Sequence, residues 1–442
     1  MPAAGPTHLN PRERNPVIPT LITIRVRLLS PGGVTGPERR HLDTGEEEPA
    51  NHLPLRRDPD HVVTLPGTTV AGSLKAHCAL WPGLPSDLFG GAPEDEKKVA
   101  SPVQVLGVRL RGALPAVTSA TRVAIDRHRG AARVHALFTV EQLPAGTEFD
   151  VHLRWDDAGA ALQRFLDAVR GWRPWIGRGV TTGAGGCAVT GVGWRSYDLS
   201  RTDGLLEWLT VEGPATYPQP TEVLPAPSPR TAAIDVVLDI VDGLHIGRGA
   251  SEPLEGPETK VSLVVQRNNG EPYVPGSSLK GVLRSRVEYI CRVLGHPACD
   301  DAGCGTCQAC LLFGWSPRSG GDPRMGARAA VAIPDAVIDG AEFDLRTHVA
   351  LDRVTGGARS GLLYAQQVVV TGHFRLRVEP LRCLTDVELA LLRACVADLH
   401  DGLVGIGTAT TRGLGTVRVC DDAWTVPDLT ALATLVTGGS DG

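Results

Sequence analysis

A cluster of cysteines in the second half of the chain has the spacing of a metal site. Cys304, Cys307 and Cys310 are each separated by two residues, and thiolates at that spacing suit tetrahedral zinc. The fourth ligand is either His296 or Cys299, and we expect His296 slightly more. Free or redox-active cysteines and an iron–sulfur cluster are the alternatives. The pattern predicts a zinc site.

Two short segments have the composition of a helix start that binds anions. Residues 66–69 read Pro-Gly-Thr-Thr and residues 275–278 read Pro-Gly-Ser-Ser. A helix N-terminus offers free N–H groups and a partial positive charge, and glycine keeps the backbone approachable. An ordinary capped helix is the alternative, but the recurrence with a nearby basic residue favours phosphate binding. The side chains expected to contribute are Thr68, Thr69, Lys75, Ser277, Ser278, Lys280 and Arg284.

A glycine-rich segment lies near the end of each half, at residues 177–185 and 405–415. Both are expected to be loops with exposed amides, and they contain Arg178 and Arg412. Such a loop is able to cradle a sugar-phosphate backbone, although a tight turn is the alternative. Neither has the Gly-Lys-Ser/Thr spacing of a mononucleotide-binding loop, so ATP is not expected.

These motifs form an internal repeat. The helix start recurs at an offset of 209 residues, Leu-Phe-Gly at 224, an Asp-Arg motif at 226 and the glycine loop at 230. An ordered set of this kind indicates a duplicated unit. The offset grows by 15 between the first two motifs, in the segment that holds the cysteines. The second unit therefore contains an insertion, and its zinc is expected to be structural.

Each unit shows the same predicted order of elements. Alternating apolar residues predict a first strand, and a helix follows at the Pro-Gly motif, with Ser277 or Ser278 as N-cap in the second unit. Further strands, a second helix and the glycine loop before a last strand complete each unit. The predicted fold class is α+β, with two tandem ferredoxin-like (RRM-like) units. The predicted boundaries are 18–205 for unit one, 206–232 for a proline-rich linker, 233–424 for unit two with the zinc-binding insertion at 296–310, and 425–442 for a C-terminal tail.

The composition limits the possible classes of function. A chain of 442 residues suits two domains, and its net charge of −5 argues against nucleic-acid binding over the whole surface. Any contact with nucleic acid must therefore be local. We find no apolar run long enough to span a membrane and no signal-peptide pattern at the N-terminus. With ten cysteines and no export signal, we predict a reduced cytoplasmic protein without a membrane partner.

The motifs resemble those of a known family. Residues 274–281, 307–314 and 351–353, followed by the last glycine loop, resemble the RAMP superfamily of CRISPR-associated proteins. The chain is similar to a fusion of two backbone subunits of type III effector complexes. This resemblance implies CRISPR RNA, complementary target RNA and other type III effector subunits as partners in antiviral defence. It also implies that the units stack along the guide RNA and kink it with a protruding hairpin.

The resemblance further implies candidate residues for catalysis. Many such subunits cut target RNA with an aspartate on the loop between the first strand and the first helix. Asp43 and Glu258 are our candidates for that position, with Mg²⁺ or Mn²⁺ as the metal ion. Solvent-exposed loop acids without a function are the alternative.

Other residues are expected along the RNA path. Asp126-Arg127 and Asp352-Arg353 are interpreted as ion pairs that shape the hairpins, with the arginine near RNA. Together with Arg127 and Arg353, we expect His245 and Arg248 to lie along the RNA path.

Two other functions stay open. The first is a stand-alone endoribonuclease that processes precursor CRISPR RNA by general acid–base catalysis, without a divalent ion. Enzymes of that kind also have tandem ferredoxin-like units and a glycine-rich loop. The second is a zinc-stabilised scaffold with no nucleic-acid role. The helix start in both units and the zinc insertion favour the backbone subunit over the processing enzyme.

Overall fold

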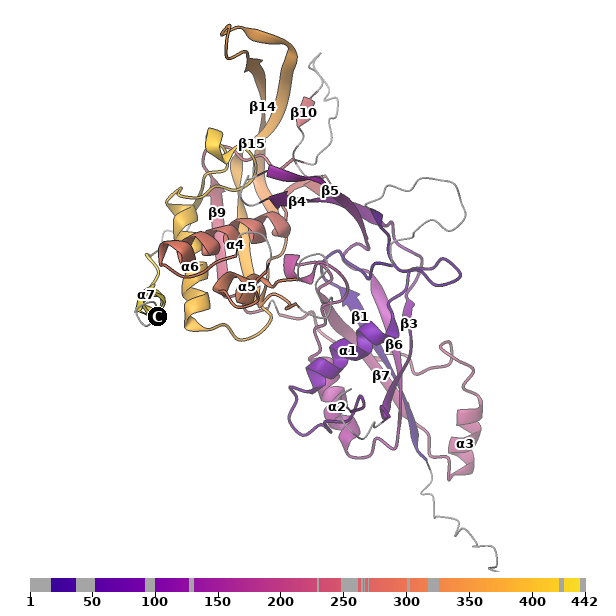
Figure 1. Ribbon diagram of the computed structural model, residues 1–442. Coiled ribbons are helices and arrows are strands. Elements are labelled where there is room, and N and C mark those ends of the chain that lie inside the picture. The colour runs from indigo at the N-terminus through magenta and orange to yellow at the C-terminus, as the bar shows by residue number, and fades with distance from the viewer. Residues whose placement is uncertain are drawn as a thin grey trace, which may run out of the picture.

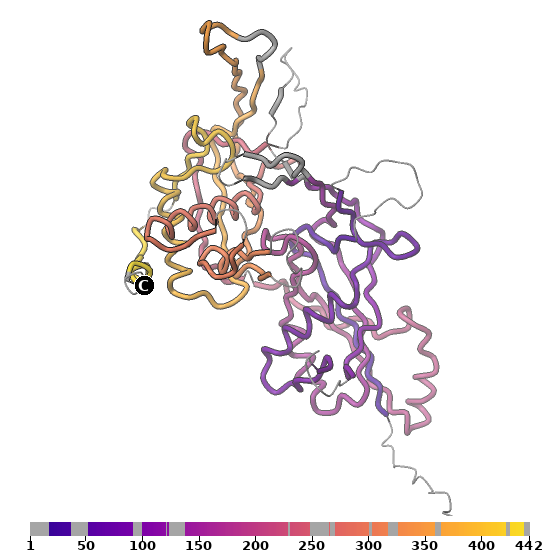
Figure 2. Tube along the Cα trace, in the orientation of Figure 1, coloured from indigo at the N-terminus to yellow at the C-terminus, as the bar shows by residue number. Residues whose placement is uncertain are grey.

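Each half of the chain folds around one sheet whose central strands are antiparallel (Figure 1). The computed structural model describes residues 17–36, 52–91, 100–126, 131–228, 230–247, 261–263, 265, 267–268, 270–299, 303–316, 326–420 and 425–437. Figure 2 follows the chain from the first lobe to the second. No described helix is long and apolar enough to cross a membrane.

Unit one has the strand order β3-β6-β1-β7-β8. Helices α1 and α2 pack on one face of this sheet, where Leu74, Val151 and Phe165 are fully buried. Both helices contribute apolar residues to one core, so they shield that face from water. The elements of this sheet layer are β1 (Pro19–Leu28), α1 (Gly67–Cys78), β3 (Val103–Leu110), β6 (Glu148–Asp156), α2 (Ala161–Arg170), β7 (Cys187–Ser196) and β8 (Glu222–Val223).

Unit two repeats this arrangement with the strand order β14-β15-β9-β16. Its helices α4 and α6 enclose a core that includes Leu283, Phe374 and Leu392. The elements of this layer are β9 (Ile234–Ile240), α4 (Gly276–Val293), β14 (Ala336–Leu351), β15 (Ala358–Pro380), α6 (Asp386–His400) and β16 (Val417–Val419). Smaller elements at its edges are β11 (Arg267–Asn268), β12 (Glu271–Val274), α5 (Gln308–Phe313) and β13 (Val331–Ala332).

The two units agree down to single hydrogen bonds. In unit one the Ile176 amide donates to the Gly185 carbonyl at 2.8 Å, and in unit two the Ile406 amide donates to the Gly415 carbonyl at 2.9 Å. Each glycine loop contains a short 3₁₀ turn, η1 (Val180–Thr182) or η2 (Thr410–Arg412). The structure therefore confirms that both halves of the chain have the same architecture.

Each unit also has a β-hairpin. In unit one it is formed by β4 (Thr118–Asp126) and β5 (Ala131–Gln142), which also pairs in parallel with β2 (His52–Leu53). In unit two, β14 and β15 continue beyond the sheet as a long hairpin that projects from the molecule (Figure 1). There β10 (Val261–Leu263) pairs in parallel with β15.

The predicted serine N-cap of α4 is wrong. The helix begins at Gly276, before both predicted serines, with Pro275 at the N-cap position and no side-chain cap. Asp335 from the loop before β14 accepts a hydrogen bond from the Gly276 amide at 2.7 Å and so satisfies a free donor of the helix start. The hydroxyl of Ser277 is therefore available for another contact.

The predicted linker is more structured than its proline content indicated. It contains the end of α3 (Thr202–Leu209) and the edge strand β8. Tyr217 lies edge-on to His152, with ring centroids 5.0 Å apart, and His152 is hydrogen bonded to the buried Thr23 on β1. This segment therefore covers part of the sheet face opposite the helices.

The predicted C-terminal tail also packs on the protein. It contains η3 (Thr430–Leu432) and α7 (Ala433–Thr437). Leu435 is 7% exposed and belongs to the core of unit two, so this part of the tail extends that core.

Candidate functional site

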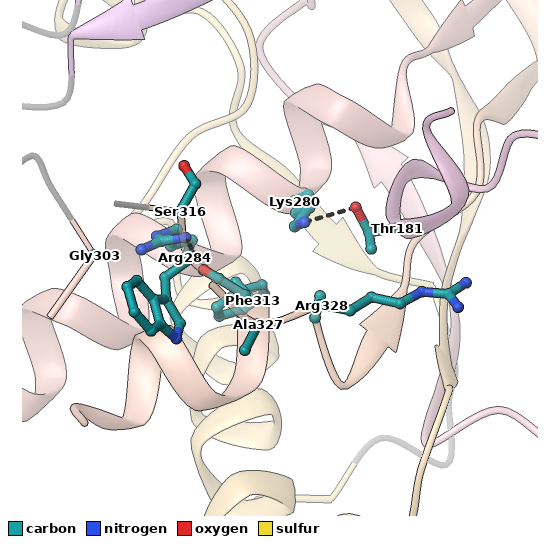
Figure 3. Close-up of a pocket in the computed structure, with 11 residues that line it drawn as sticks. Thr181, Lys280, Arg284, Gly303, Phe313, Ser316, Ala327 and Arg328 are labelled. Atoms are coloured by element: carbon teal, nitrogen blue, oxygen red, sulfur yellow. Dashed lines mark hydrogen bonds between the residues drawn. The ribbon is translucent and has the colours of Figure 1, made fainter. Parts of the chain in front are cut away.

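The glycine loop of unit one rests on the helix start of unit two. The Lys280 ammonium donates to Thr181 Oγ1 at 2.8 Å (Figure 3), and the Ile333 amide donates to the Thr181 carbonyl at 3.3 Å. On the hairpin of unit one, Arg122 Nη1 donates to Ser277 Oγ at 3.1 Å. The two sequence motifs that we interpreted as phosphate sites therefore meet each other at the junction between the units.

Two glycines permit this close approach. A Cβ on Gly183 would lie 2.3 Å from Pro334 Cα of unit two, and one on Gly276 would lie 2.9 Å from the Thr182 carbonyl oxygen of unit one. Any larger residue at either position would push the two backbones apart. The recurring glycines of the motifs thus have a packing role at this junction, in addition to any role with a ligand.

A polar cavity of about 380 Å³ opens at this junction. Its basic lining residues are Lys280, Arg284 and Arg328 (Figure 3), and none of its described lining residues is acidic. Burial, assisted by the neighbouring Arg284, lowers the pKa of Lys280 to about 8. A site with this charge suits an anion such as a phosphate.

The shifted pKa of Lys280 predicts a pH-dependent stability. Lys280 titrates near 8 in the folded chain and at its ordinary value of 10.5 when unfolded, so between these values the unfolded state binds more protons. The free energy of unfolding should therefore rise as the pH rises through this window. Urea unfolding at about pH 7.5 and about pH 9.5 should show a smaller rise for Lys280→Met than for the parent. An equal rise in both proteins would contradict the assignment.

Lys75 and Arg284 occupy equivalent positions, and each donates a hydrogen bond to a glycine carbonyl of its own unit. Lys75 Nζ donates to the Gly90 carbonyl at 3.1 Å, and Arg284 Nη1 donates to the Gly314 carbonyl at 2.8 Å. Each bond ties the helix to the Leu-Phe-Gly motif of its unit. The recurrence of a basic residue thus has a structural explanation, and a direct contact of either side chain with RNA stays a prediction.

Other predicted RNA-binding residues lie on the surface. Arg178 and Arg412 are exposed on their glycine loops, Thr68 is exposed at the start of α1, and Arg353 is exposed at the tip of the β14–β15 hairpin. Thr69 and Ser278 are half-buried on the first turns of their helices. These positions remain compatible with a polyanion at the surface.

His245 does not line a surface path, contrary to our prediction. Its side chain is 1% exposed, and its Nδ1 is hydrogen bonded to the Gln367 carbonyl at 2.6 Å. Its own carbonyl accepts from the Thr408 amide, so the residue joins the hairpin to the glycine loop of unit two. Burial lowers the pKa of this imidazole. The ring is held inside the protein because the turn after β9 folds under that loop.

The Asp-Arg motif of unit two forms the turn at the hairpin tip. Asp352 Oδ1 accepts hydrogen bonds from the amides of Val354 and Thr355, both at 2.9 Å, and these bonds lower the pKa of the Asp352 carboxyl. The carboxylate is thus engaged with the backbone of the turn, where we expected an ion pair with Arg353. The Asp352 carboxylate therefore helps to shape the turn of the hairpin.

Four predicted residues lie outside the described part of the chain. These are the two candidate catalytic acids and two arginines, namely Asp43, Glu258, Arg127 and Arg248.

A second cavity, of about 720 Å³, lies in unit one. Glu141 on β5 accepts from the Leu55 amide at 2.9 Å, and its carboxylate lies 3.4 Å from His52 Nε2 and 3.5 Å from Arg57 Nη2. Gly36 and His52 both line the cavity and flank the segment that contains Asp43.

The sequence alone did not single out Glu141, although the 226-residue offset pairs it with Gln367. Gln367 in unit two also accepts a backbone amide, from Val265 at 3.2 Å. Each of the two side chains thus accepts a hydrogen bond from a backbone amide of its own unit. In unit one, Glu141 also lies beside His52 and Arg57.

The cysteines converge on one point. The sulfur atoms of Cys299, Cys304, Cys307 and Cys310 all lie within 4.8 Å of one another. Cys299 Sγ is 3.6 Å from Cys307 Sγ and 3.4 Å from Cys310 Sγ. Four sulfurs around a tetrahedral zinc ion at about 2.3 Å would lie about 3.8 Å apart, so the cluster fits such an ion.

The expectation that His296 is the fourth ligand is wrong for this geometry. His296 Nε2 faces the carbonyl oxygen of Leu435 in the C-terminal segment, and the four-sulfur cluster includes Cys299 instead. The ring turns away because α4 ends at Val293, before the chain bends towards the cysteines.

Hydrogen bonds favour the thiolate form of Cys304, whereas burial raises the pKa of Cys299 and of Cys307. Cys299 Sγ accepts from the Cys304 amide at 3.0 Å, and Cys304 Sγ accepts from the Cys307 amide at 3.3 Å. The hydrogen bond that the Thr306 hydroxyl donates to Cys304 Sγ is the largest of the effects that lower the pKa of Cys304 to about 5. Thiolates are the form that binds metal ions, so both spacing and hydrogen bonding suit zinc.

The repeated sheet layer, the glycine loops and the paired helix starts define a protein of two related α+β units. The family model of the RAMP superfamily matches residues 25–188 and 237–418, one segment in each unit and together more than half of the chain. The chain therefore belongs to the RAMP superfamily, whose members are CRISPR-associated, and it is a two-unit RAMP protein. Among curated proteins, none matches the chain.

Proposed function

We propose that the protein is a CRISPR RNA-binding backbone subunit of a type III effector complex and holds two consecutive positions on the guide. In this proposal each unit is ferredoxin-like, which agrees with a strand–helix–strand–strand–helix–strand order and an antiparallel 2-3-1-4 sheet. CRISPR RNA, complementary target RNA and other effector subunits are the proposed partners.

The junction between the units is the observation that carries the proposal. The glycine loop of unit one packs on the helix start of unit two through Thr181, Lys280 and Ile333, which sets one repeat directly after the other. A backbone subunit needs a fixed distance between consecutive grips on the guide. The direct contacts of this junction, together with Arg122 and Ser277, supply such a fixed spacing.

Each unit leaves one of the paired surfaces open. The start of α1 with Thr68 and the glycine loop of unit two with Arg412 are exposed. They correspond to the two surfaces that meet at the internal junction. In the proposed complex these open surfaces face neighbouring subunits and the guide RNA.

Removing the loop arginines should weaken RNA binding. The Arg178→Ala/Arg412→Ala variant should bind single-stranded RNA about tenfold more weakly or worse, because two charge-assisted contacts are lost. The salt dependence of log K should become shallower by about 1.4, or about 0.7 per lost phosphate contact. Fluorescence anisotropy over a salt series measures both.

The control has the same charge change elsewhere. Arg195→Ala/Arg201→Ala removes two arginines that are paired with Glu207 and Asp203 at α3, and it should bind RNA as the parent does. Equal losses in both double variants would reject the proposed RNA surface in favour of a non-specific charge effect.

We further propose that a bound zinc ion is structural and that any cleavage of target RNA depends on Mg²⁺ or Mn²⁺ at Asp43 or Glu258. The cavity beside Glu141, at the ends of the segment with Asp43, favours unit one for this activity. Target-RNA cleavage by Asp43→Ala and Glu258→Ala in the assembled complex tests the assignment, and parental rates for both would reject it.

Cleavage of repeat RNA that persists in EDTA and needs His52 would instead favour the precursor-processing enzyme.

A further inference from the structure

Arg284 on α4 links the cysteine cluster to the body of unit two. Its guanidinium directs three nitrogens at three acceptors. Nε donates to Glu288 Oε1 at 2.9 Å, Nη1 donates to the Gly314 carbonyl at 2.8 Å, and Nη2 lies 3.8 Å from Cys310 Sγ. The pair is well shielded, since the side chains of Arg284 and Glu288 are 15% and 2% exposed.

Unit one provides an internal comparison. At the position equivalent to Arg284 it has Lys75, which makes the corresponding bond to the Gly90 carbonyl. The cysteines equivalent to the cluster are missing from its sequence. The bond to the Leu-Phe-Gly motif therefore needs only a basic side chain. The planar three-way fork of arginine occurs in the unit that also has the sulfur cluster.

We propose that Arg284 is a positioning residue for the metal centre, which orients Cys310 and partly neutralises its thiolate. The inference rests on the proposed zinc site. A divalent ion with four thiolates has a net charge of −2, which is costly to hold at a site where three of the four cysteines are buried. A guanidinium beside one sulfur reduces that cost, and Glu288 holds the guanidinium in place. This arrangement corresponds to the carboxylate–histidine–zinc pattern of other sites.

The geometry also explains why lysine is a poor substitute. A lysine at position 284 could reach the Gly314 carbonyl, as Lys75 reaches Gly90. A single ammonium on a flexible stem cannot keep the fixed directions to Glu288 and Cys310 at the same time. Arg284→Lys therefore separates the link to the Leu-Phe-Gly motif from the link to the metal centre.

The test is the zinc affinity of the full chain, measured by competition with a chromogenic chelator. Arg284→Gln should bind zinc about 10- to 100-fold more weakly than the parent, and Arg284→Lys about tenfold more weakly. The matched control, Lys75→Gln, breaks the equivalent bond in unit one and should keep the parental affinity. Far-UV circular dichroism of each variant shows whether it is folded.

Cobalt substitution supplies a second measurement. The Arg284→Lys protein loaded with Co²⁺ should keep the absorption of a four-thiolate site, because all four cysteines remain. Parental zinc affinity in both Arg284 variants would overturn the inference, as would an equal loss in Lys75→Gln. A parent that binds no zinc would overturn the zinc site itself, and that outcome is distinct from the other two.

Discussion

Cys307→Ser is expected to lose its zinc ion and to unfold the segment around α5. Structural zinc contributes directly to folding free energy, because the ligands are not held together in the unfolded chain. Beside the cluster, Leu312 and Phe313 are 0% and 2% exposed, and exposing each costs about 1.5–3 kcal/mol. The loss should therefore be several kcal/mol. Zinc content, thermal unfolding and limited proteolysis near residue 307 measure it.

Metal removal should reproduce this effect in the parental protein. A chelator such as 1,10-phenanthroline should lower the unfolding temperature of the parent and leave Cys307→Ser unchanged. Cys383→Ser is the control, since Cys383 is exposed and lies outside the cluster. If Cys307→Ser keeps both its zinc and the parental unfolding temperature, the cluster is not a structural metal site.

Gly185→Ala is expected to destabilise unit one by about 3 kcal/mol or more. Gly185 has φ of +71°, and a Cβ there would lie 2.0 Å from the Ile176 carbonyl oxygen. The left-handed backbone costs about 1–2 kcal/mol for a residue other than glycine, and the clash with backbone adds to it. Urea unfolding measures the change. Gly415→Ala should act in the same way in unit two, where the Cβ would lie 2.2 Å from the Ile406 carbonyl oxygen.

Gly413→Ala separates strain from steric clash. Gly413 has φ of +82°, and among the described residues nothing lies within 4 Å of the position that a Cβ would take there. Its replacement should therefore cost only the backbone strain, about 1–2 kcal/mol. Should Gly185→Ala be no less stable than Gly413→Ala, the close contact between the loop and Ile176 is not maintained in solution.

The sequence was sufficient for features that depend on local pattern. The alternation of apolar and polar residues predicted the first strand of each unit, β1 and β9. A second helix was expected in unit two where α6 lies. The ordered motifs revealed the duplication. These signals reside in neighbouring residues, whose periodicity directly determines which face is buried. The cysteine spacing likewise predicted three members of the cluster.

Contacts between distant residues were decided by the tertiary structure. Thr181 and Lys280 are 99 residues apart in the chain, and their hydrogen bond exists only because two separately folded units dock. The choice of Cys299 over His296 depended on the direction in which the chain leaves α4.

The role of a polar side chain also depended on what packs around it. His245 is a residue type that often binds ligands at a surface, but here it is buried under the glycine loop of unit two. Glu141 meets His52 only because β2 pairs with β5. Spacing along the chain determines which elements form, because those interactions are local. Which side chains meet is determined by how the elements pack, since that depends on the summed contacts of the whole fold.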